Sequence, residues 1–178
     1  ISTKVNAGGK MSVPNGTATS TMVNSGGNMD VFGGTATSTM VNSGGNMTVA
    51  YAGSATSTTV NNGGNMNIGW AGRGMSTTVN SGGKMNIIIG TAMATWINSG
   101  GEMIVSRGGN AVATTVNGGG ELTISSSGSA TSTTVNSGGK IWISDGGSAI
   151  SMQVNTGGNI NGFTVRMNTH YDSVVHVS

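Results

Sequence analysis

A repeat of 18 or 19 residues runs through most of this chain and limits its fold more than any other feature. Each copy contains a Val-Asn or Ile-Asn pair, one further residue, and then two adjacent glycines. The nine Val or Ile anchors are Val5, Val23, Val41, Val60, Val79, Ile97, Val116, Val135 and Val154. From the second copy onward, another glycine stands seven residues before the anchor. Each copy therefore has two glycine-marked corners.

Between the corners, apolar residues alternate with other residues, which is typical of a strand with one buried face. The segment after the glycine pair reads Met29-x-Val31, Met47-x-Val49 and so on through Ile141-x-Ile143. The segment before the anchor carries Thr two residues ahead of it, usually with Ala three residues earlier. We therefore expect two short strands in each coil.

A coil of this length cannot bury its apolar face alone, but stacked coils bury it continuously. The sequence thus predicts an all-β chain, a right-handed β-solenoid of about nine coils over residues 1–161. At about 4.8 Å per coil the rod would be roughly 40 Å long. Residues 162–178 break the repeat and are predicted to form a cap or junction segment at the C-terminal end.

The residue after each anchor is Asn in all nine copies. In a solenoid these residues would stack at one corner, where side-chain amides can bond along the axis. We interpret them as a structural ladder. Its interior members, each with a neighbour on both sides, are Asn24, Asn42, Asn61, Asn80, Asn98, Asn117 and Asn136.

Composition excludes several classes of function. Seven scattered basic residues against five acidic ones make no basic face for nucleic acid. The chain has no cysteine for a disulfide or zinc finger, and no apolar run long enough for membrane insertion of this segment. Glu102 and Glu121 would be neighbours, but Lys84 and Lys140 flank them, which favours a solvated surface over catalysis. We expect no enzyme and no cofactor.

The tail holds the one set of metal-ligating residue types, namely His170, Asp172 and His176. We predict no metal site there. Its Val174 to Val177 segment has the alternation of one more strand, which would close the open end of the solenoid.

Large side chains recur at the second glycine-marked corner. Successive coils present Phe32, Tyr51, Trp70, Ile88 and Arg107. Such a stripe would allow aromatic stacking, with the guanidinium capping the rings. It would serve as a ridge for glycan contact or self-association, or as a ladder that stabilises the corner.

Alternation also places several apolar side chains outward, namely Met22, Met40, Trp96, Ile104 and Trp142. Several such residues on one rod indicate a contact surface. Three residues before the anchor stands a column of serines that we also place outward. Its members are Ser2, Ser20, Ser38, Ser57, Ser76, Ser132 and Ser151, with Ala94 and Ala113 interrupting it.

The repeat V-N-x-G-G, an apolar-x-apolar strand, then G-x-A-x-x-T-x-V resembles the passenger repeats of AIDA-type self-associating autotransporter adhesins. The match is clear in the segment from Gly34 to Gly45. The resemblance implies an extracellular passenger on the surface of a Gram-negative bacterium, acting in adhesion, autoaggregation and biofilm formation. It also implies host-surface glycan or protein partners, and a glycosyltransferase that modifies repeat serines during biogenesis; our candidates are Ser20, Ser38, Ser57, Ser76, Ser132 and Ser151. The sequence lacks the translocator, so we expect a passenger fragment.

We therefore expect an adhesin passenger that acts by lateral association of rods, with the many weak contacts adding through avidity. One alternative is a structural subunit or stalk of an extracellular fibre. An ice-binding solenoid is a third hypothesis because Thr-x-Thr tracts such as Thr19 to Thr21 recur. It is less favoured, since Met22, Met40 and Trp96 interrupt a regular Thr lattice.

Overall fold

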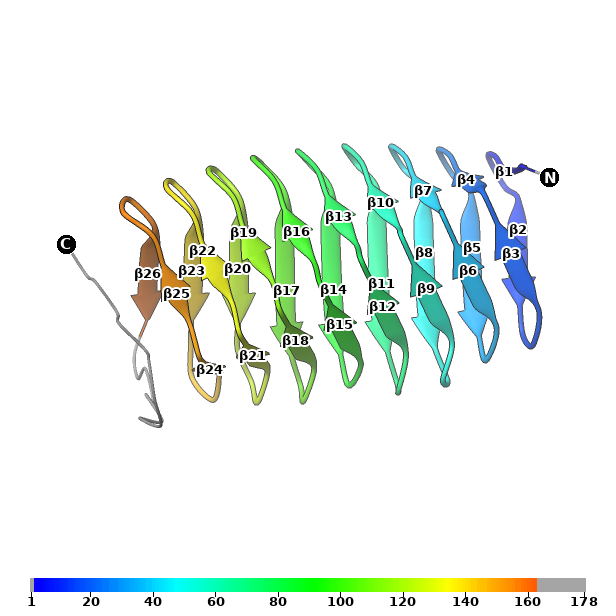
Figure 1. Cartoon of the computed structure of the whole chain (residues 1–178). Coiled ribbons are helices and arrows are strands. Elements are labelled where there is room, and N and C mark those ends of the chain that lie inside the picture. The colour runs from blue at the N-terminus through cyan, green and yellow to red at the C-terminus, as the bar shows by residue number, and fades with distance from the viewer. Residues whose placement is uncertain (1, 163–178) are drawn as a thin grey trace.

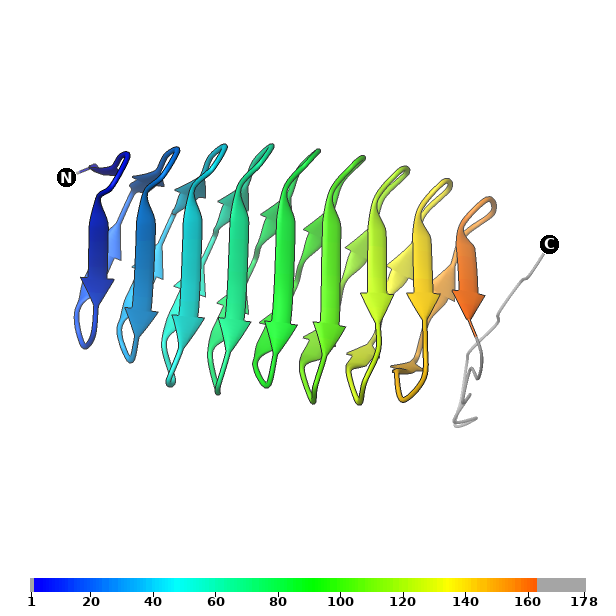
Figure 2. The same cartoon turned by 180° about the vertical axis from the view of Figure 1, so that it is seen from behind.

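The computed structural model describes residues 2–162 as a rod of stacked parallel strands. Three sheets run along the rod, and each strand pairs in parallel with its counterpart in the next coil. On the face shown in Figure 1, the chain rises through sheet C, which begins with Thr17–Thr19, and sheet A, which begins with Thr3–Val5. It then descends through sheet B, which faces the viewer in Figure 2. This path makes the solenoid right-handed, as predicted.

Successive coils add one strand to each sheet, which gives nine strands in sheets A and B and eight in sheet C over the described residues. Sheet A consists of β1 (Thr3–Val5), β4 (Thr21–Val23), β7 (Met40–Val41), β10 (Thr59–Val60), β13 (Thr78–Val79), β16 (Trp96–Ile97), β19 (Thr115–Val116), β22 (Thr134–Val135) and β25 (Gln153–Val154). Sheet B consists of β2 (Lys10–Val13), β5 (Asn28–Phe32), β8 (Asn46–Ala50), β11 (Asn65–Gly69), β14 (Lys84–Ile88), β17 (Glu102–Ser106), β20 (Glu121–Ile124), β23 (Lys140–Ile143) and β26 (Asn159–Gly162). Sheet C consists of β3 (Thr17–Thr19), β6 (Thr35–Thr37), β9 (Ser54–Thr56), β12 (Arg73–Met75), β15 (Thr91–Met93), β18 (Asn110–Val112), β21 (Ser129–Thr131) and β24 (Ser148–Ile150).

The expectation of two strands per coil was wrong, because a third corner divides the segment before each anchor. In the second coil this corner is Ser20, which has a φ of 52° between β3 and β4. Ala18 and Thr21 are both buried but stand three positions apart, so a strand of period two cannot place both side chains inward. A single left-handed residue turns the chain and brings Thr21 inside. We call this position the Ser corner; it is occupied by Ser2, Ser20, Ser38, Ser57, Ser76, Ala94, Ala113, Ser132 and Ser151.

The Asn corner joins sheets A and B and consists of the Asn, the next residue and the two glycines. Its first glycine takes positive φ, as at Gly82 with φ +70°. Its second glycine excludes any side chain, since a Cβ at Gly83 would lie 2.5 Å from the carbonyl oxygen of Val60. The glycine pair thus meets one conformational and one steric requirement.

The variable corner joins sheets B and C, and it absorbs the difference between 18 and 19 residues. Three residues separate the inward Val31 from Thr35, whereas four separate Val49 from Ser54. The strands on both sides keep their register across this change, with Val31 paired to Val49 and Thr35 paired to Ser54.

The core is a narrow column of aliphatic side chains. Met29, Met47, Met66, Met85 and Met103 are stacked and buried, and Leu122 and Ile141 continue their row. The Thr before each anchor is buried as well, and its hydroxyl has no hydrogen-bond partner among the described residues. These are Thr21, Thr39, Thr58, Thr77, Thr95, Thr114 and Thr133.

Residues 2–162 contain no helix that is long and apolar enough to cross a membrane. Apart from Gly162, the predicted C-terminal cap lies outside the described residues. The tail strand and the His170, Asp172 and His176 set lie there too.

Candidate functional site

The asparagines after the anchors form one continuous ladder along the Asn corner. Each Nδ2 donates to the Oδ1 of the preceding coil at 2.7 to 3.0 Å, from Asn24 to Asn6 through Asn155 to Asn136. Because both amide groups of an interior Asn are used in this way, the ladder stabilises the rod and offers little to a ligand.

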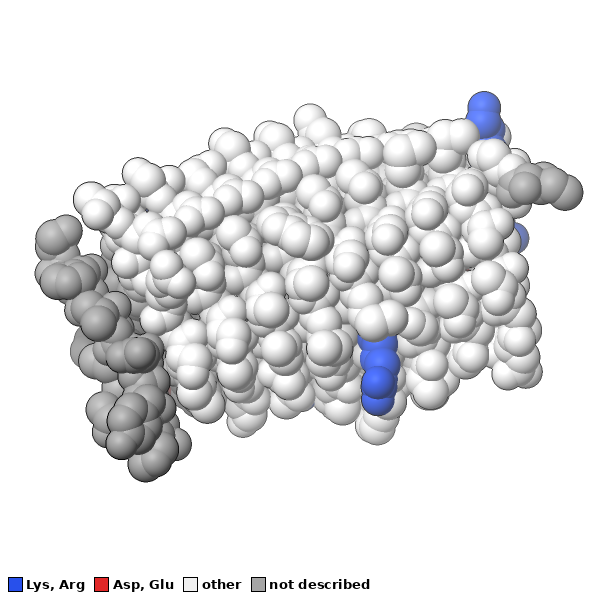
Figure 3. Space-filling view, viewed as in Figure 1, with Lys and Arg blue, Asp and Glu red and all other residues white. Residues whose placement is uncertain are grey.

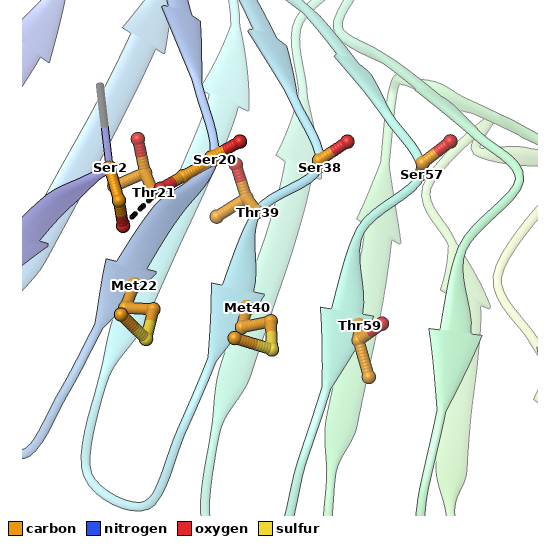
Figure 4. Close-up of a pocket in the computed structure, with 9 residues that line it drawn as sticks. All are labelled: Ser2, Ser20, Thr21, Met22, Ser38, Thr39, Met40, Ser57 and Thr59. Atoms are coloured by element: carbon orange, nitrogen blue, oxygen red, sulfur yellow. Dashed lines mark hydrogen bonds between the residues drawn. The ribbon is translucent and has the colours of Figure 1, made fainter.

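The Ser corner presents an exposed row of hydroxyls. Ser20, Ser38 and Ser57 form one rim of a groove of about 330 Å³, and Met22 and Met40 lie on its other side (Figure 4). Ser2 donates a hydrogen bond from its Oγ to the carbonyl oxygen of Ser20 at 3.1 Å. The serines are exposed because they occupy a corner, whereas the sequence prediction had placed them on the outer face of a strand.

The left-handed backbone at the Ser corner has an energetic cost for any residue except glycine. The φ values run from 52° to 55°, where an L-residue is less stable by about 1 to 2 kcal/mol. Glycine fills the left-handed position of every Asn corner, yet it appears at none of the Ser corners. A side chain thus stands at every Ser corner despite the strain, which indicates a role beyond closing the turn.

A second row of hydroxyls was missed by the sequence analysis. It lies at the tip of the Asn corner, one residue after the ladder, and its members are Ser25, Ser43, Ser81, Ser99, Ser137 and Thr156. All six are exposed, and the turns that carry them project from the rod in Figure 1. The signal was present in the repeat itself, because Ser is the commonest residue between the Asn and the two glycines.

The five large side chains predicted to form one stripe at the second glycine-marked corner belong instead to two neighbouring columns. Phe32 ends strand β5 and pairs with Ala50, and Ile88 likewise ends β14 and pairs with Gly69. Tyr51, Trp70 and Arg107 stand one residue later, in the left-handed turn of the variable corner. Within residues 2–162 the one close aromatic pair is Phe32 with Tyr51, edge to face at 5.3 Å, and no ring lies under the Arg107 guanidinium.

These side chains nevertheless surround one hollow. Phe32, Tyr51, Trp70 and Ile88 line a groove of about 220 Å³ on the outer face of sheet B, together with Thr48, Ala50, Asn67, Ile68, Gly69 and Asn86. Tyr51 and Trp70 are its most exposed members, at 64% and 62%. The groove thus combines aromatic rings with amide side chains.

A second apolar patch surrounds the two alanines of the Ser corner, Ala94 and Ala113. On sheet C, Met75 pairs with Met93 and Met93 with Val112, and Trp96 begins strand β16 of sheet A two residues after Ala94. Met75, Met93 and Trp96 are 37%, 43% and 42% exposed. We call these six residues the alanine-gap patch.

The faces that flank this patch carry few charges. Figure 3 shows them nearly free of charged side chains. The strands of sheets A and C hold Lys4 and Arg73 and no acidic residue. Two copies could therefore approach here with little electrostatic repulsion.

Two further exposed apolar side chains, Ile104 and Trp142, lie on sheet B. Ile104 and Trp142 occupy one outer column with Thr123 between them, and both are exposed. In the neighbouring column, Lys84 Nζ lies 2.9 Å from Glu102 Oε2. Lys140 Nζ lies 3.3 Å from Glu121 Oε1. The paired carboxylates are thus partly exposed and bound to lysines.

Within residues 2–162, no group of three His, Cys, Asp or Glu residues is placed to hold a metal ion. The Thr-x-Thr tracts do not make a flat hydroxyl lattice either. Thr21 and Thr133, the later members of two tracts, are buried.

Two comparisons with known proteins find relatives. Residues 27–83 match a family described as "Adhesin of bacterial autotransporter system, probable stalk". The solved structure of a TibC-catalysed hyper-glycosylated TibA fragment aligns with a TM-score of 0.67 and 30% sequence identity, over 92% of this chain and 92% of that one. No curated protein matches the chain in sequence.

Proposed function

This chain belongs to the AIDA family of autotransporter adhesin passengers, and on that basis we propose that it promotes adhesion, autoaggregation and biofilm formation by association of one rod with another. It would act outside a Gram-negative cell, displayed on the cell surface, and without catalysis. Its contacts would repeat along the rod, so many weak interactions would add.

The alanine-gap patch is the observation that carries this proposal. It combines exposed Met75, Met93 and Trp96 with nearly uncharged flanking faces. A strip about 40 Å long and about 20 Å wide along the Ser corner would give each partner about 800 Å², the size of a standard protein interface. An axial contact through single coil ends would bury less.

Sedimentation velocity over a wide concentration range tests this association. The first variant changes Met93 and Trp96 to Ser, and the matched control changes Trp142 to Ser on sheet B. We expect concentration-dependent dimers for the unmodified chain and the control, and a monomer for the first variant. If dimers are lost only in the Trp142 variant, the contact between rods lies on sheet B. A monomer under all conditions would contradict self-association for this chain.

We also propose that a glycosyltransferase modifies serines of the repeat. The TibA fragment that aligns with this chain is hyper-glycosylated. The predicted acceptors at the Ser corner are exposed and kept in a strained backbone. The serines at the tip of the Asn corner are the rival row, because their projecting turns would enter a transferase active site more readily than a groove would.

Mass spectrometry of peptides after co-expression with a TibC-type transferase distinguishes the two rows. Ser38 and Ser43 are the most useful pair, since they lie in one coil and represent one row each. Modification of Ser43 without Ser38 would reject the Ser-corner acceptors. Absence of sugar from both rows would contradict the modification proposal.

A passive stalk or fibre subunit is the second candidate function. The regular hydrogen-bonded stack of coils and the family description as a stalk favour it. The same sedimentation experiment separates the two, because a stalk remains monomeric while a fibre subunit forms elongated end-to-end species that the Met93 and Trp96 changes leave intact.

A further inference from the structure

The hollow on the outer face of sheet B has the chemistry of a small sugar site. We propose that it binds a neutral oligosaccharide, with Tyr51 and Trp70 stacking on the sugar rings and Asn67 and Asn86 bonding their hydroxyls. The site lies on a different sheet from the alanine-gap patch, so it can be tested independently of rod-to-rod association.

The shape of the hollow follows from one column of residues at the end of sheet B. Phe32 and Ile88 bound it at the two ends, and the small residues Ala50 and Gly69 form its floor between them. Three coil steps of about 4.8 Å separate the ends, about 14 Å in all. This length accommodates one or two pyranose rings.

Gly69 leaves space that the fold does not require. Its φ lies outside the left-handed region, and a Cβ there would meet only the carbonyl oxygen of Ile88, at 3.5 Å. An ordinary side chain would therefore fit in this strand and would fill the hollow. By contrast, Gly72 in the adjoining turn could not be replaced, because a Cβ there would clash with the Val49 carbonyl oxygen.

The aromatic residues are not needed to close the turn. Arg107 and Ser126 occupy the same place as Tyr51 in corners of equal length, with φ values of 50° and 46°, so a ring is not required there. Tyr51 and Trp70 have φ values of 51° and 30°, which are unusual for bulky side chains. Both rings are also largely exposed, so they contribute little to the core. Strain and exposure together indicate a role outside folding.

The polar wall of the hollow favours an uncharged ligand. Asn86 donates from Nδ2 to Asn67 Oδ1 at 3.0 Å, which leaves one amide group of each residue without a partner among residues 2–162. None of the ten lining residues carries a formal charge at neutral pH. Aromatic rings that meet the apolar face of a sugar, beside amides that meet its hydroxyls, match a neutral pyranoside. Phe32 supports the arrangement by its edge-to-face contact with Tyr51.

Ligand-observed saturation-transfer NMR tests the site with four probes: cellobiose, lactose, maltose and N,N′-diacetylchitobiose. We expect at least one probe to bind the unmodified chain saturably at millimolar concentration. Tyr51→Gly and Trp70→Gly should each weaken that binding by about tenfold, through lost stacking. Gly69→Leu should abolish it by filling the hollow. Arg107→Gly is the matched control, since it changes the same turn position outside the hollow and should bind as the unmodified chain does.

Melting temperatures of the same variants separate binding from folding. Glycine relieves the left-handed strain, so Tyr51→Gly and Trp70→Gly should melt at or above the unmodified chain. A lower melting temperature in both would assign the rings to the fold and overturn the proposal. It would equally be overturned if no probe binds saturably, or if the Gly69→Leu variant binds normally. Sedimentation velocity of these variants should be unchanged, because the proposed dimer contact lies elsewhere.

Discussion

Asn80 donates a hydrogen bond from its Nδ2 to the Oδ1 of Asn61 at 3.0 Å, and its own Oδ1 accepts from Asn98 at 2.9 Å. Each interior asparagine of the ladder thus joins three coils. The terminal Asn6 accepts one bond, from Asn24, at an exposed site. Position within the ladder should therefore decide how much each amide stabilises the rod.

We expect Asn80→Ala to lower the free energy of unfolding by about 1 to 3 kcal/mol, since it removes two partly buried hydrogen bonds. Asn6→Ala should lower it by less than about 1 kcal/mol. Urea unfolding of both variants, followed by circular dichroism, measures the difference. Equal losses at the two positions would show that the ladder does not act as a stack of paired amides.

Replacing a buried threonine by valine should raise the stability of the rod. The Thr77 hydroxyl is buried and has no partner among the described residues, so its desolvation is not offset. Thr77→Val keeps the shape and should raise the free energy of unfolding by about 1 kcal/mol. Thr78→Val on the outer face is the control and should change it by less than about 0.5 kcal/mol. A loss at Thr77 would indicate that its hydroxyl is hydrogen-bonded in solution.

Substitution by alanine at two nearby glycines should change the free energy of unfolding in opposite directions. Gly72→Ala would force a Cβ against the Val49 carbonyl oxygen, so we expect a loss of about 2 kcal/mol or more. Gly69→Ala meets only an ordinary contact and restricts the unfolded chain, so a gain of about 0.5 kcal/mol is expected. Differential scanning calorimetry compares the two variants directly. A destabilised Gly69→Ala would remove one support for the sugar site.

Substitution by glycine should change the stability of the rod differently in the two exposed rows of serines. Ser76 has a φ of 53°, so Ser76→Gly relieves strain that Ser81→Gly does not. Glycine also loses more backbone entropy on folding, by about 0.5 to 1 kcal/mol. We therefore expect Ser76→Gly to be neutral or stabilising and Ser81→Gly to be destabilising. Thermal unfolding of the unglycosylated variants measures this, and matching losses would contradict the strain assigned to the Ser corner.

The stacking register was predictable because the repeat itself encodes it. Once the anchors are aligned, Met66 falls beside Met85 and Ile68 beside Ile87, as the structure pairs them. The amide ladder follows from the same alignment. Opposite charges at Lys84 and Glu102 meet for the same reason.

The Ser corner was missed although its signal was present. Ala18 and Thr21 both stand in buried columns three residues apart, a spacing that one continuous strand cannot satisfy. The shape of the outer surface was harder to predict from the sequence. Phe32 and Tyr51 differ by one position relative to their strands, and only the three-dimensional structure shows that they touch, while no ring among residues 2–162 lies against Arg107. The hollow depends on the missing side chain of Gly69, which no motif marks.

The variable corner also bears on how such a rod can diversify. Because one residue can be added between β8 and β9 relative to β5 and β6 without moving any paired position, changes of length there are neutral to the stack. Related chains could therefore acquire new loops, and new binding specificities, along this one edge while the core and the ladder stay unaltered. The same edge is the natural place to graft a foreign peptide for display.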